Sequence, residues 1–286
     1  MRYALVIRVA GAVALLGLAG AAACGSPPAH SKPIAAAPTK AARPGVDPAD
    51  SPDPSDPPSP SRSPNPKAST RTPTPSPSTR RPRRGPDGSL RTTGSSAVAL
   101  TFDDGPDPVN TPPLLDLLKR YNVKATFCLV GFRARDYPAI VARIAAEGHT
   151  LCNHTWQHLQ DFSKREDSYV RWDLKSTNDA ILAAAPGAKI TYFRAPYGNF
   201  NPRLDGFAAE LNLKSIYWDV DDESWRTDKY GVGPAMSQHI RYEVQTYTRP
   251  GSIILSHDNK KPWTAATYGT LLPWLKQHFQ LIALPT

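Results

Sequence analysis

The 286-residue sequence predicts an α/β domain built on a parallel sheet or barrel, preceded by an export signal and a long proline-rich segment. Two observations predict this fold class. From residue 97 to the end, short apolar runs rich in β-forming residues alternate with longer helical segments, which is typical of a parallel sheet. Carboxylate and imidazole side chains follow several of these runs, at the strand ends where parallel α/β folds place their active sites.

Residues 1–24 have the composition of a secretory signal peptide. Arg2 and Arg8 precede a nearly uncharged run of 15 residues that ends in three alanines before Cys24. A spanning helix is the weaker interpretation, because a bilayer needs roughly 20 apolar residues. The small residues before Cys24 resemble a bacterial lipobox, although Ala21 stands where that motif prefers leucine or another aliphatic residue. We therefore expect an exported protein with lipid on Cys24, and ordinary cleavage or an uncleaved anchor are the alternatives.

Residues 25–95 are dominated by proline, serine, threonine and arginine. Of the 31 prolines in the chain, 18 lie between Pro27 and Pro86. Such a segment buries too little apolar surface to offset the entropy of ordering, so we expect a disordered tether with a reach on the order of 200 Å. The arginine cluster at 80–84 is predicted to be solvated and attracted to anionic lipid or wall polymer.

The net charge of +9 belongs mainly to the segments before the predicted domain. Residues 96–286 hold 21 basic and 20 acidic residues, so the domain is nearly neutral. An exported protein with a neutral domain lacks the basic surface that nucleic-acid binding requires, and that function class is excluded. The 191 residues of 96–286 suffice for one domain with a substantial core.

Within this domain, strands and helices are expected in alternation. The expected strands are 97–102, 124–130, 150–153, 190–194, 214–218, 252–256 and 280–283. The expected helices are 112–121, 137–147, 166–185, 202–211, 234–247 and 264–278. The first strand ends at Asp103 and Asp104, followed by the turn residues Gly105 and Pro106. Taken alone, this stretch is also explained as an aspartate-rich turn without catalytic function.

Three further clusters follow later strands. His154 and His158 come after the third strand, and their spacing of four residues places both imidazoles on one face of a helical turn, within reach of one cation. With Asp104 they form a two-histidine, one-carboxylate set that leaves positions open for water and substrate. Arg194 opens the sequence Arg-Ala-Pro-Tyr-Gly after the fourth strand, and His257 follows the sixth. Taken alone, each cluster is also explained by a surface, turn or core role.

In this order and at predicted strand ends, these stretches resemble the polysaccharide deacetylase family, also called the NodB homology domain or carbohydrate esterase family 4. The matching motifs are TFDDG at 101–105, HTWQH at 154–158, RAPYG at 194–198 and LSH at 255–257. The resemblance covers about residues 96–286 and leaves the tether outside it. It implies a distorted (β/α) barrel with about seven strands.

The resemblance implies a hydrolytic centre with a divalent metal. Asp103 resembles the catalytic base of the family, and Asp104, His154 and His158 resemble the ligands of the metal, usually zinc. Arg194 is then expected to hold Asp103 in place. Amide hydrolysis agrees with this set, because a divalent metal makes water nucleophilic near neutral pH.

The resemblance also implies the groups that act on the carbonyl and the leaving amine. The backbone N–H of Tyr197 is expected to stabilise the oxyanion together with the metal. His257 is expected to protonate the departing amine as the general acid, since an amine leaves poorly without a proton.

The fifth family motif, usually Asp-x-x-Asp-Trp, is altered in this sequence. Asp221 and Trp225 match it, but Ser224 stands in place of the second aspartate. In the family that carboxylate supports the general-acid histidine, so the resemblance leaves the tuning of the acid open. Asp222 and Asp258 are alternative sources of the missing charge.

Asp221, Trp225 and Tyr197 are expected to contact substrate. Trp225 and Tyr197, with Trp156, are predicted to form an apolar wall for a sugar ring, and a role as core aromatics is the alternative. Cys128 and Cys152 lie in strands that would be neighbours in the implied fold. Export permits a disulfide between them, and free buried cysteines are the alternative.

The expected activity is removal of N-acetyl groups from a glycan. The expected glycan is the peptidoglycan of the cell itself, because the tether and the lipid would hold the domain at the envelope. Chitooligosaccharides and acetylated xylan are the substrates that the motifs leave open. A non-catalytic glycan-binding protein on the same fold is the alternative from another class. We expect the protein to be a monomer.

Overall fold

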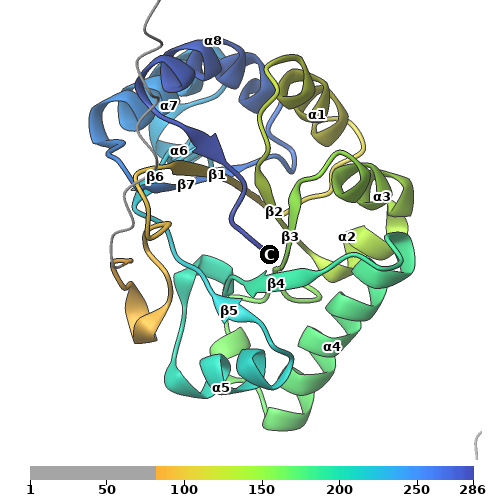
Figure 1. Cartoon of the computed structure of the whole chain (residues 1–286). Coiled ribbons are helices and arrows are strands. Elements are labelled where there is room, and N and C mark those ends of the chain that lie inside the picture. The colour runs from red at the N-terminus through yellow and green to blue at the C-terminus, as the bar shows by residue number, and fades with distance from the viewer. Residues whose placement is uncertain (1–81) are drawn as a thin grey trace, which may run out of the picture. The chain divides into compact units, whose positions relative to one another are not determined.

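The computed structural model describes residues 82–286, which form a parallel sheet curled into an open barrel with helices around its outside (Figure 1). The predicted signal peptide, Cys24 and the tether up to residue 81 lie outside the described residues. None of the helices in the described part of the chain is long and apolar enough to cross a membrane.

The sheet has eight parallel strands in the order β5-β4-β3-β2-β1-β7-β6, and β8 pairs with the start of β1. The predicted fold class, a distorted (β/α) barrel, is therefore confirmed, with β5 and β6 as its two ends. The strands are β1 Val98–Asp103, β2 Thr126–Leu129, β3 Thr150–Asn153, β4 Ile190–Phe193, β5 Lys214–Ser215, β6 Val220–Asp221, β7 Ile253–His257 and β8 Leu281–Ile282.

The helices include all six that the sequence predicts, with ends shifted by a few residues. They are α1 Thr111–Arg120, α2 Gly131–Asp136, α3 Pro138–Ala146, α4 Asp167–Ala184, α5 Pro202–Glu210, α6 Thr227–Tyr230, α7 Pro234–Tyr247 and α8 Trp263–His278. The sequence analysis missed α2, α6 and β6. These elements span six, four and two residues, too short for a periodic pattern to identify.

Alternation along β1 explains how this strand serves both the core and the pocket. Val98, Leu100 and Phe102 are fully buried in the main core between the sheet and the helices. Burying each of these side chains contributes about 2 kcal/mol. Ala99 belongs to the smaller cluster inside the barrel. Because successive side chains of a strand point to opposite faces, Asp103 shares the inner face with Ala99.

A disulfide and the C-terminal residues fill the barrel interior. Cys128 and Cys152 lie directly opposite each other on β2 and β3 and form a disulfide, rather than remaining free buried cysteines. Near the C-terminus, Leu284 accepts a hydrogen bond from the Thr150 hydroxyl (2.6 Å) and donates its N–H to the Thr126 hydroxyl (3.0 Å). Figure 1 accordingly shows the C-terminus in the middle of the ring of strands.

The packed chain begins before residue 96, the boundary that composition suggested. Leu90 pairs with Ile216 just beyond β5, and Thr92 pairs with the residue before β7. Arg83, at the end of the arginine cluster expected to be solvated, forms an ion pair with Asp219 of the domain. The physical reason is that strand edges carry unpaired N–H and C=O groups, which this short segment satisfies.

Candidate active site

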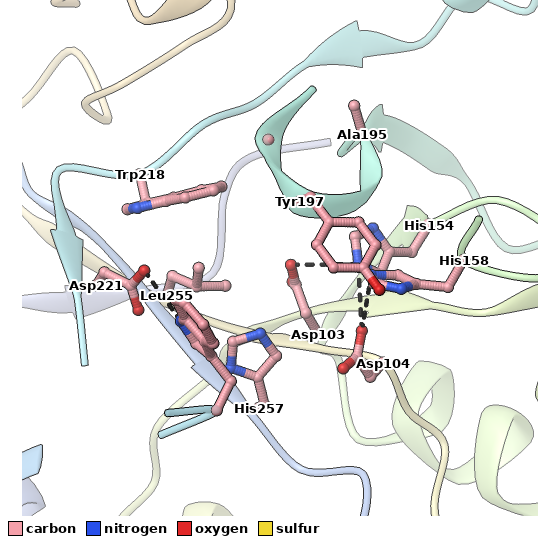
Figure 2. Close-up of a pocket in the computed structure, with 12 residues that line it drawn as sticks. Asp103, Asp104, His154, His158, Ala195, Tyr197, Trp218, Asp221, Leu255 and His257 are labelled. Carbon is pink, nitrogen blue, oxygen red and sulfur yellow. Dashed lines mark hydrogen bonds and ion pairs between the residues drawn. The ribbon is translucent and has the colours of Figure 1, made fainter. Parts of the chain in front are cut away.

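The residues identified in the sequence converge at the carboxyl ends of the strands (Figure 2). The sequence analysis assigned nine residues to catalysis, metal binding or substrate contact. Eight of them line one pocket of about 340 Å³, and the ninth, Arg194, is fully buried beneath it. Asp103 and Asp104 come from the end of β1, and His257 ends β7. In the β1–β7 register Asp103 is the direct partner of His257, so the two side chains stand on neighbouring strands.

Asp104 and the two histidines form a compact group. Asp104 Oδ1 lies 3.4 Å from His154 Nε2 and 3.3 Å from His158 Nε2. The three ligand atoms lie within 4.8 Å of one another. The same carboxylate oxygen is buried and has no hydrogen-bond partner within residues 82–286. A buried carboxylate oxygen that faces two imidazole nitrogens is the donor set of a divalent cation, so these residues fit a metal.

A hydrogen bond orients the His154 ring. Its Nδ1 lies 2.7 Å from the carbonyl oxygen of Arg194. Because a carbonyl can only accept, Nδ1 carries the proton, and Nε2 presents its lone pair to Asp104 and the pocket. The ring is 2 % exposed and has little freedom to turn.

The segment at 154–158 is a loop, and the expectation of a helical turn was wrong. Thr155 and His158 have φ values of 65° and 54°, in the left-handed region. The loop N–H groups bond to side chains instead of to helical carbonyls: Asn153 Oδ1 accepts from Thr155 (2.9 Å), and Asp173 on α4 accepts from the following residue (2.7 Å). This conformation brings the two imidazole centroids within 4.7 Å.

The Arg194 guanidinium holds Asp103. Its Nη1 donates to Asp103 Oδ1 (2.7 Å) and to the Thr101 hydroxyl (2.8 Å), and Nη2 donates to the carbonyl of Tyr217 (2.9 Å). The other oxygen, Asp103 Oδ2, lies 3.6 Å from His154 Nε2. Because both charges are buried and paired, the carboxylate is fixed with one oxygen toward the guanidinium and one toward His154.

The charge states of the group suit a cation. Burial opposes the charge on Asp104, but contact with His154 and the nearby imidazoles outweighs burial and lowers the pKa of this carboxyl. Burial, reinforced by His154, lowers the pKa of His158 to about 4. At neutral pH His158 is therefore a neutral imidazole and Asp104 is ionised, which are the forms that coordinate metals.

Aromatic rings form the pocket wall. Tyr197 and Trp225 are 59 % and 50 % exposed, and Trp218 stands on the opposite side of the pocket from Tyr197 (Figure 2). Gly198 adopts φ 69°, and a Cβ there would meet the Trp218 ring at 2.8 Å, so the turn requires glycine. Trp156, expected in this wall, instead packs outside the pocket against Trp172 (ring centroids 6.0 Å apart).

Sequence reasoning missed several residues that build the site. Trp218 lines the pocket, Asp173 holds the histidine loop and Thr101 anchors the buried arginine. They belong to none of the matched motifs except Thr101, which opens TFDDG. Only the alternation along β1, which places Thr101 on the same face as Asp103, gave a signal for any of them.

Comparison with known proteins agrees with the motifs. The family described as polysaccharide deacetylase matches residues 90–216. A chitooligosaccharide deacetylase of Sinorhizobium fredii is 38 % identical over 170 residues, covering 59 % of this chain and 75 % of that protein. A peptidoglycan-N-acetylglucosamine deacetylase of Bacillus cereus is 41 % identical over 160 residues, covering 56 % of this chain and 55 % of that protein. The crystal structure of the Bc1960 peptidoglycan N-acetylglucosamine deacetylase matches with a TM-score of 0.60 and 35 % identity, over 66 % of this chain and 86 % of that one.

Proposed function

The chain belongs to the polysaccharide deacetylase family, and we propose that it is an exported, zinc-dependent enzyme that removes N-acetyl groups from peptidoglycan. One observation carries the proposal: a carboxylate and two imidazoles that fit a metal lie beside an ion-paired aspartate and a histidine, in one open pocket.

In this proposal Asp104, His154 and His158 hold the metal. Zinc is the ion we propose, because two imidazole nitrogens and one carboxylate form a common set of zinc ligands in hydrolases. A bound zinc ion supplies Lewis acidity toward the acetyl carbonyl. Burial lowers the pKa of His154, but Asp103 and Asp104 outweigh it and raise that pKa, and the same two charges favour a cation in place of the proton.

Asp103 is the proposed general base, which takes a proton from the attacking water. The ion pair with Arg194 supports this role, because it keeps the carboxylate oriented while Oδ2 remains on the side of His154. A fixed base within reach of its proton contributes about 10²- to 10⁴-fold to the rate.

His257 and Tyr197 act, in the same proposal, on the leaving amine and the carbonyl oxygen. His257 ends β7 beside the base, as a general acid must if it is to reach the amide nitrogen from the same pocket. The Pro196–Gly198 turn supports the assignment of the Tyr197 N–H to the oxyanion. Tyr197 has φ 57°, and Gly198 closes the turn by donating its N–H to the Ala195 carbonyl (3.0 Å).

The glycan is proposed to lie against the aromatic wall. Trp225 donates its indole N–H to Asp221 (3.3 Å), which orients a half-exposed ring toward the pocket. Aromatic faces pack well against the apolar face of a sugar ring. Peptidoglycan is the proposed substrate because the predicted tether and lipid would hold the domain at the envelope, and because relatives such as the Bacillus cereus deacetylase carry that activity in their names. Chitooligosaccharides, named in the Sinorhizobium fredii relative, are the alternative substrate.

Export and anchoring complete the proposal. We propose that 1–24 is a signal peptide with lipid on Cys24, that most of 25–95 is a tether, and that the monomeric deacetylase domain follows. Replacing Cys24 by alanine should move the protein from the membrane fraction to soluble or shed material. Fractionation like that of the wild type would count against lipidation.

Acetate release tests the function. Purified protein should release acetate from isolated peptidoglycan, faster than from chitin oligomers or acetylated xylan, and a chelator should stop the reaction until zinc is restored. Turnover of xylan with none of peptidoglycan would replace the proposal by an esterase. A protein that binds peptidoglycan but releases no acetate with any metal would instead be a glycan-binding member of the family.

A further inference from the structure

His257 lacks the carboxylate partner that its family motif supplies, and a hydroxyl stands in its place. Ser224 Oγ lies 3.1 Å from His257 Nδ1, and both side chains are buried. A serine oxygen can accept the Nδ1–H and so hold the ring. It carries no charge, however, so by itself it does little to stabilise the protonated imidazole that a general acid needs.

A buried carboxylate lies directly behind this serine. Asp222 is 0 % exposed, and its Oδ1 accepts the backbone N–H of Ser224 (2.9 Å). Burial raises the pKa of Asp222, and the Ser224 and Ser256 side chains act against that rise. The Tyr268 hydroxyl lies 3.4 Å from Oδ2. Every direct contact is therefore with an uncharged donor.

The absence of a direct counterion makes Asp222 unusual. Among residues 82–286, no lysine, arginine or histidine nitrogen lies within 4.0 Å of its carboxylate. Burying an unpaired carboxylate costs several kcal/mol, so stability alone is a poor explanation for an aspartate at this position. The nearest imidazole along its hydrogen-bonded contacts is His257, one serine away.

We propose that Asp222 is a positioning residue that supplies, through Ser224, the negative charge supporting His257 during proton transfer. In this arrangement the Ser224 hydroxyl donates to Asp222 and accepts from the Nδ1–H of His257, which leaves the Nε2–H for the departing amine. After Nε2 gives up its proton, the ring is neutral and keeps its Nδ1–H. The proposal rests on the proposed function, in which His257 is the general acid.

The other two neighbouring aspartates are committed elsewhere. Asp258 accepts a hydrogen bond from the Thr111 hydroxyl, and its carboxylate lies against Gly105, where an added Cβ would be 2.6 Å from Oδ1. Asp221 accepts the Trp225 indole N–H and the backbone N–H of Glu223. Within residues 82–286, neither forms a hydrogen bond with Ser224. Of the three aspartates, Asp222 is therefore the one that is hydrogen-bonded to Ser224.

Other charges also act on His257 and set the background for any pH dependence. Asp104 from the β1 end and His158 from the loop after β3 both lie within Coulombic range of its ring, as does Asp221 from β6. Lys261, which follows β7, lies within range of Asp222. Because all four remain in place in the variants below, a change in the His257 titration reports the Asp222–Ser224 pair.

The test replaces and then moves the carboxylate in the zinc-loaded protein. Asp222→Asn removes the charge with little change in shape, and Asp222→Ser combined with Ser224→Asp exchanges the two residues. Asp205→Asn is the matched control, because Asp205 also accepts a hydrogen bond from a serine, Ser215, far from the pocket. Each variant is measured for kcat against pH, and the His257 ring is titrated by NMR.

We expect Asp222→Asn to lower the His257 pKa, and with it the alkaline limb of kcat, by about one pH unit. KM should change much less than kcat. The exchanged pair should restore the limb to the wild-type position or above it, and Asp205→Asn should leave it in place. Ser224→Asp alone is less informative, because it would put two carboxylates side by side.

Two results would overturn the proposal. One is an Asp222→Asn protein that folds and titrates like the wild type. The other, which applies even if that variant does not fold, is an exchanged pair whose alkaline limb lies a unit below the wild type. Failure of the proposed function is distinguishable, because it would appear as absence of acetate release by the wild type, while the NMR titration still reports on Asp222.

Discussion

Two histidines at two strand ends of this barrel are held in different ways, and the difference matches the two roles proposed for them, metal ligand and general acid. His154, after β3, donates Nδ1–H to a backbone carbonyl, a neutral acceptor that fixes the ring with its Nε2 lone pair toward Asp104. His257, at the end of β7, contacts a serine hydroxyl backed by the buried carboxylate of Asp222. In the proposed roles, the first partner leaves Nε2 of His154 free for the metal, whereas the second would support the protonated ring of a general acid.

The largest expected effect is the loss of zinc when one of its proposed ligands is removed. His158→Ala should reduce zinc from about one equivalent per chain to a small fraction, because Asp104 and His154 alone leave too few ligands. Acetate release should fall to background. Elemental analysis of protein purified from zinc-containing buffer provides the measurement, and unchanged zinc content would refute the ligand assignment.

Asp103→Asn should retain metal binding and lose catalytic turnover. The amide keeps an oxygen that can accept from Arg194, so the fold and the zinc content should be retained. Turnover should fall by about 10²- to 10⁴-fold, because the amide does not take up a proton from water. Loss of zinc from this variant would make Asp103 a ligand and require new roles for both aspartates of β1.

A smaller effect concerns the loop that carries His154 and His158, the two histidines proposed to bind the metal. Asp173 is fully buried, and burial raises its pKa to about 7 although it accepts the Trp156 N–H. A carboxyl with a raised folded-state pKa favours the fold when protonated, and this contribution is lost between about pH 4 and pH 7 as the pH rises. Asp173→Asn keeps the acceptor and avoids the buried charge.

The stability advantage of Asp173→Asn should therefore grow with pH, by about 1–3 kcal/mol between pH 5 and pH 8. Urea unfolding of the two proteins at both pH values measures it. Equal advantages at pH 5 and pH 8 would show that Asp173 titrates near its ordinary pKa.

Much of the site could be predicted because its chemistry lies at strand ends. Asp104, His154 and His257 each follow an apolar run, and parallel strands bring such ends together at one edge. The local conformation was harder: the four-residue spacing of His154 and His158 suits a helical turn, but Asn153 and Asp173 cap the loop N–H groups and stabilise left-handed residues instead.

The supporting residues could not be found from sequence for a different reason. Trp218 enters the pocket and Ser224 reaches His257 only because the segment between β5 and β7 folds back over the strand ends. That segment contains β6, whose two residues lie in an aspartate-rich stretch typical of a turn. Contacts between distant elements have no local pattern, so the structure was needed to identify them.

The most direct test of the comparison measures zinc and acetate on the same samples of wild type, His154→Ala and His257→Ala. We predict that His154→Ala loses both the metal and the activity. His257→Ala should keep the full zinc content of the wild type while its rate on peptidoglycan falls by roughly a hundredfold or more. Equal zinc loss in the two variants, or full activity of His257→Ala, would contradict the assignment of the two histidines to different roles.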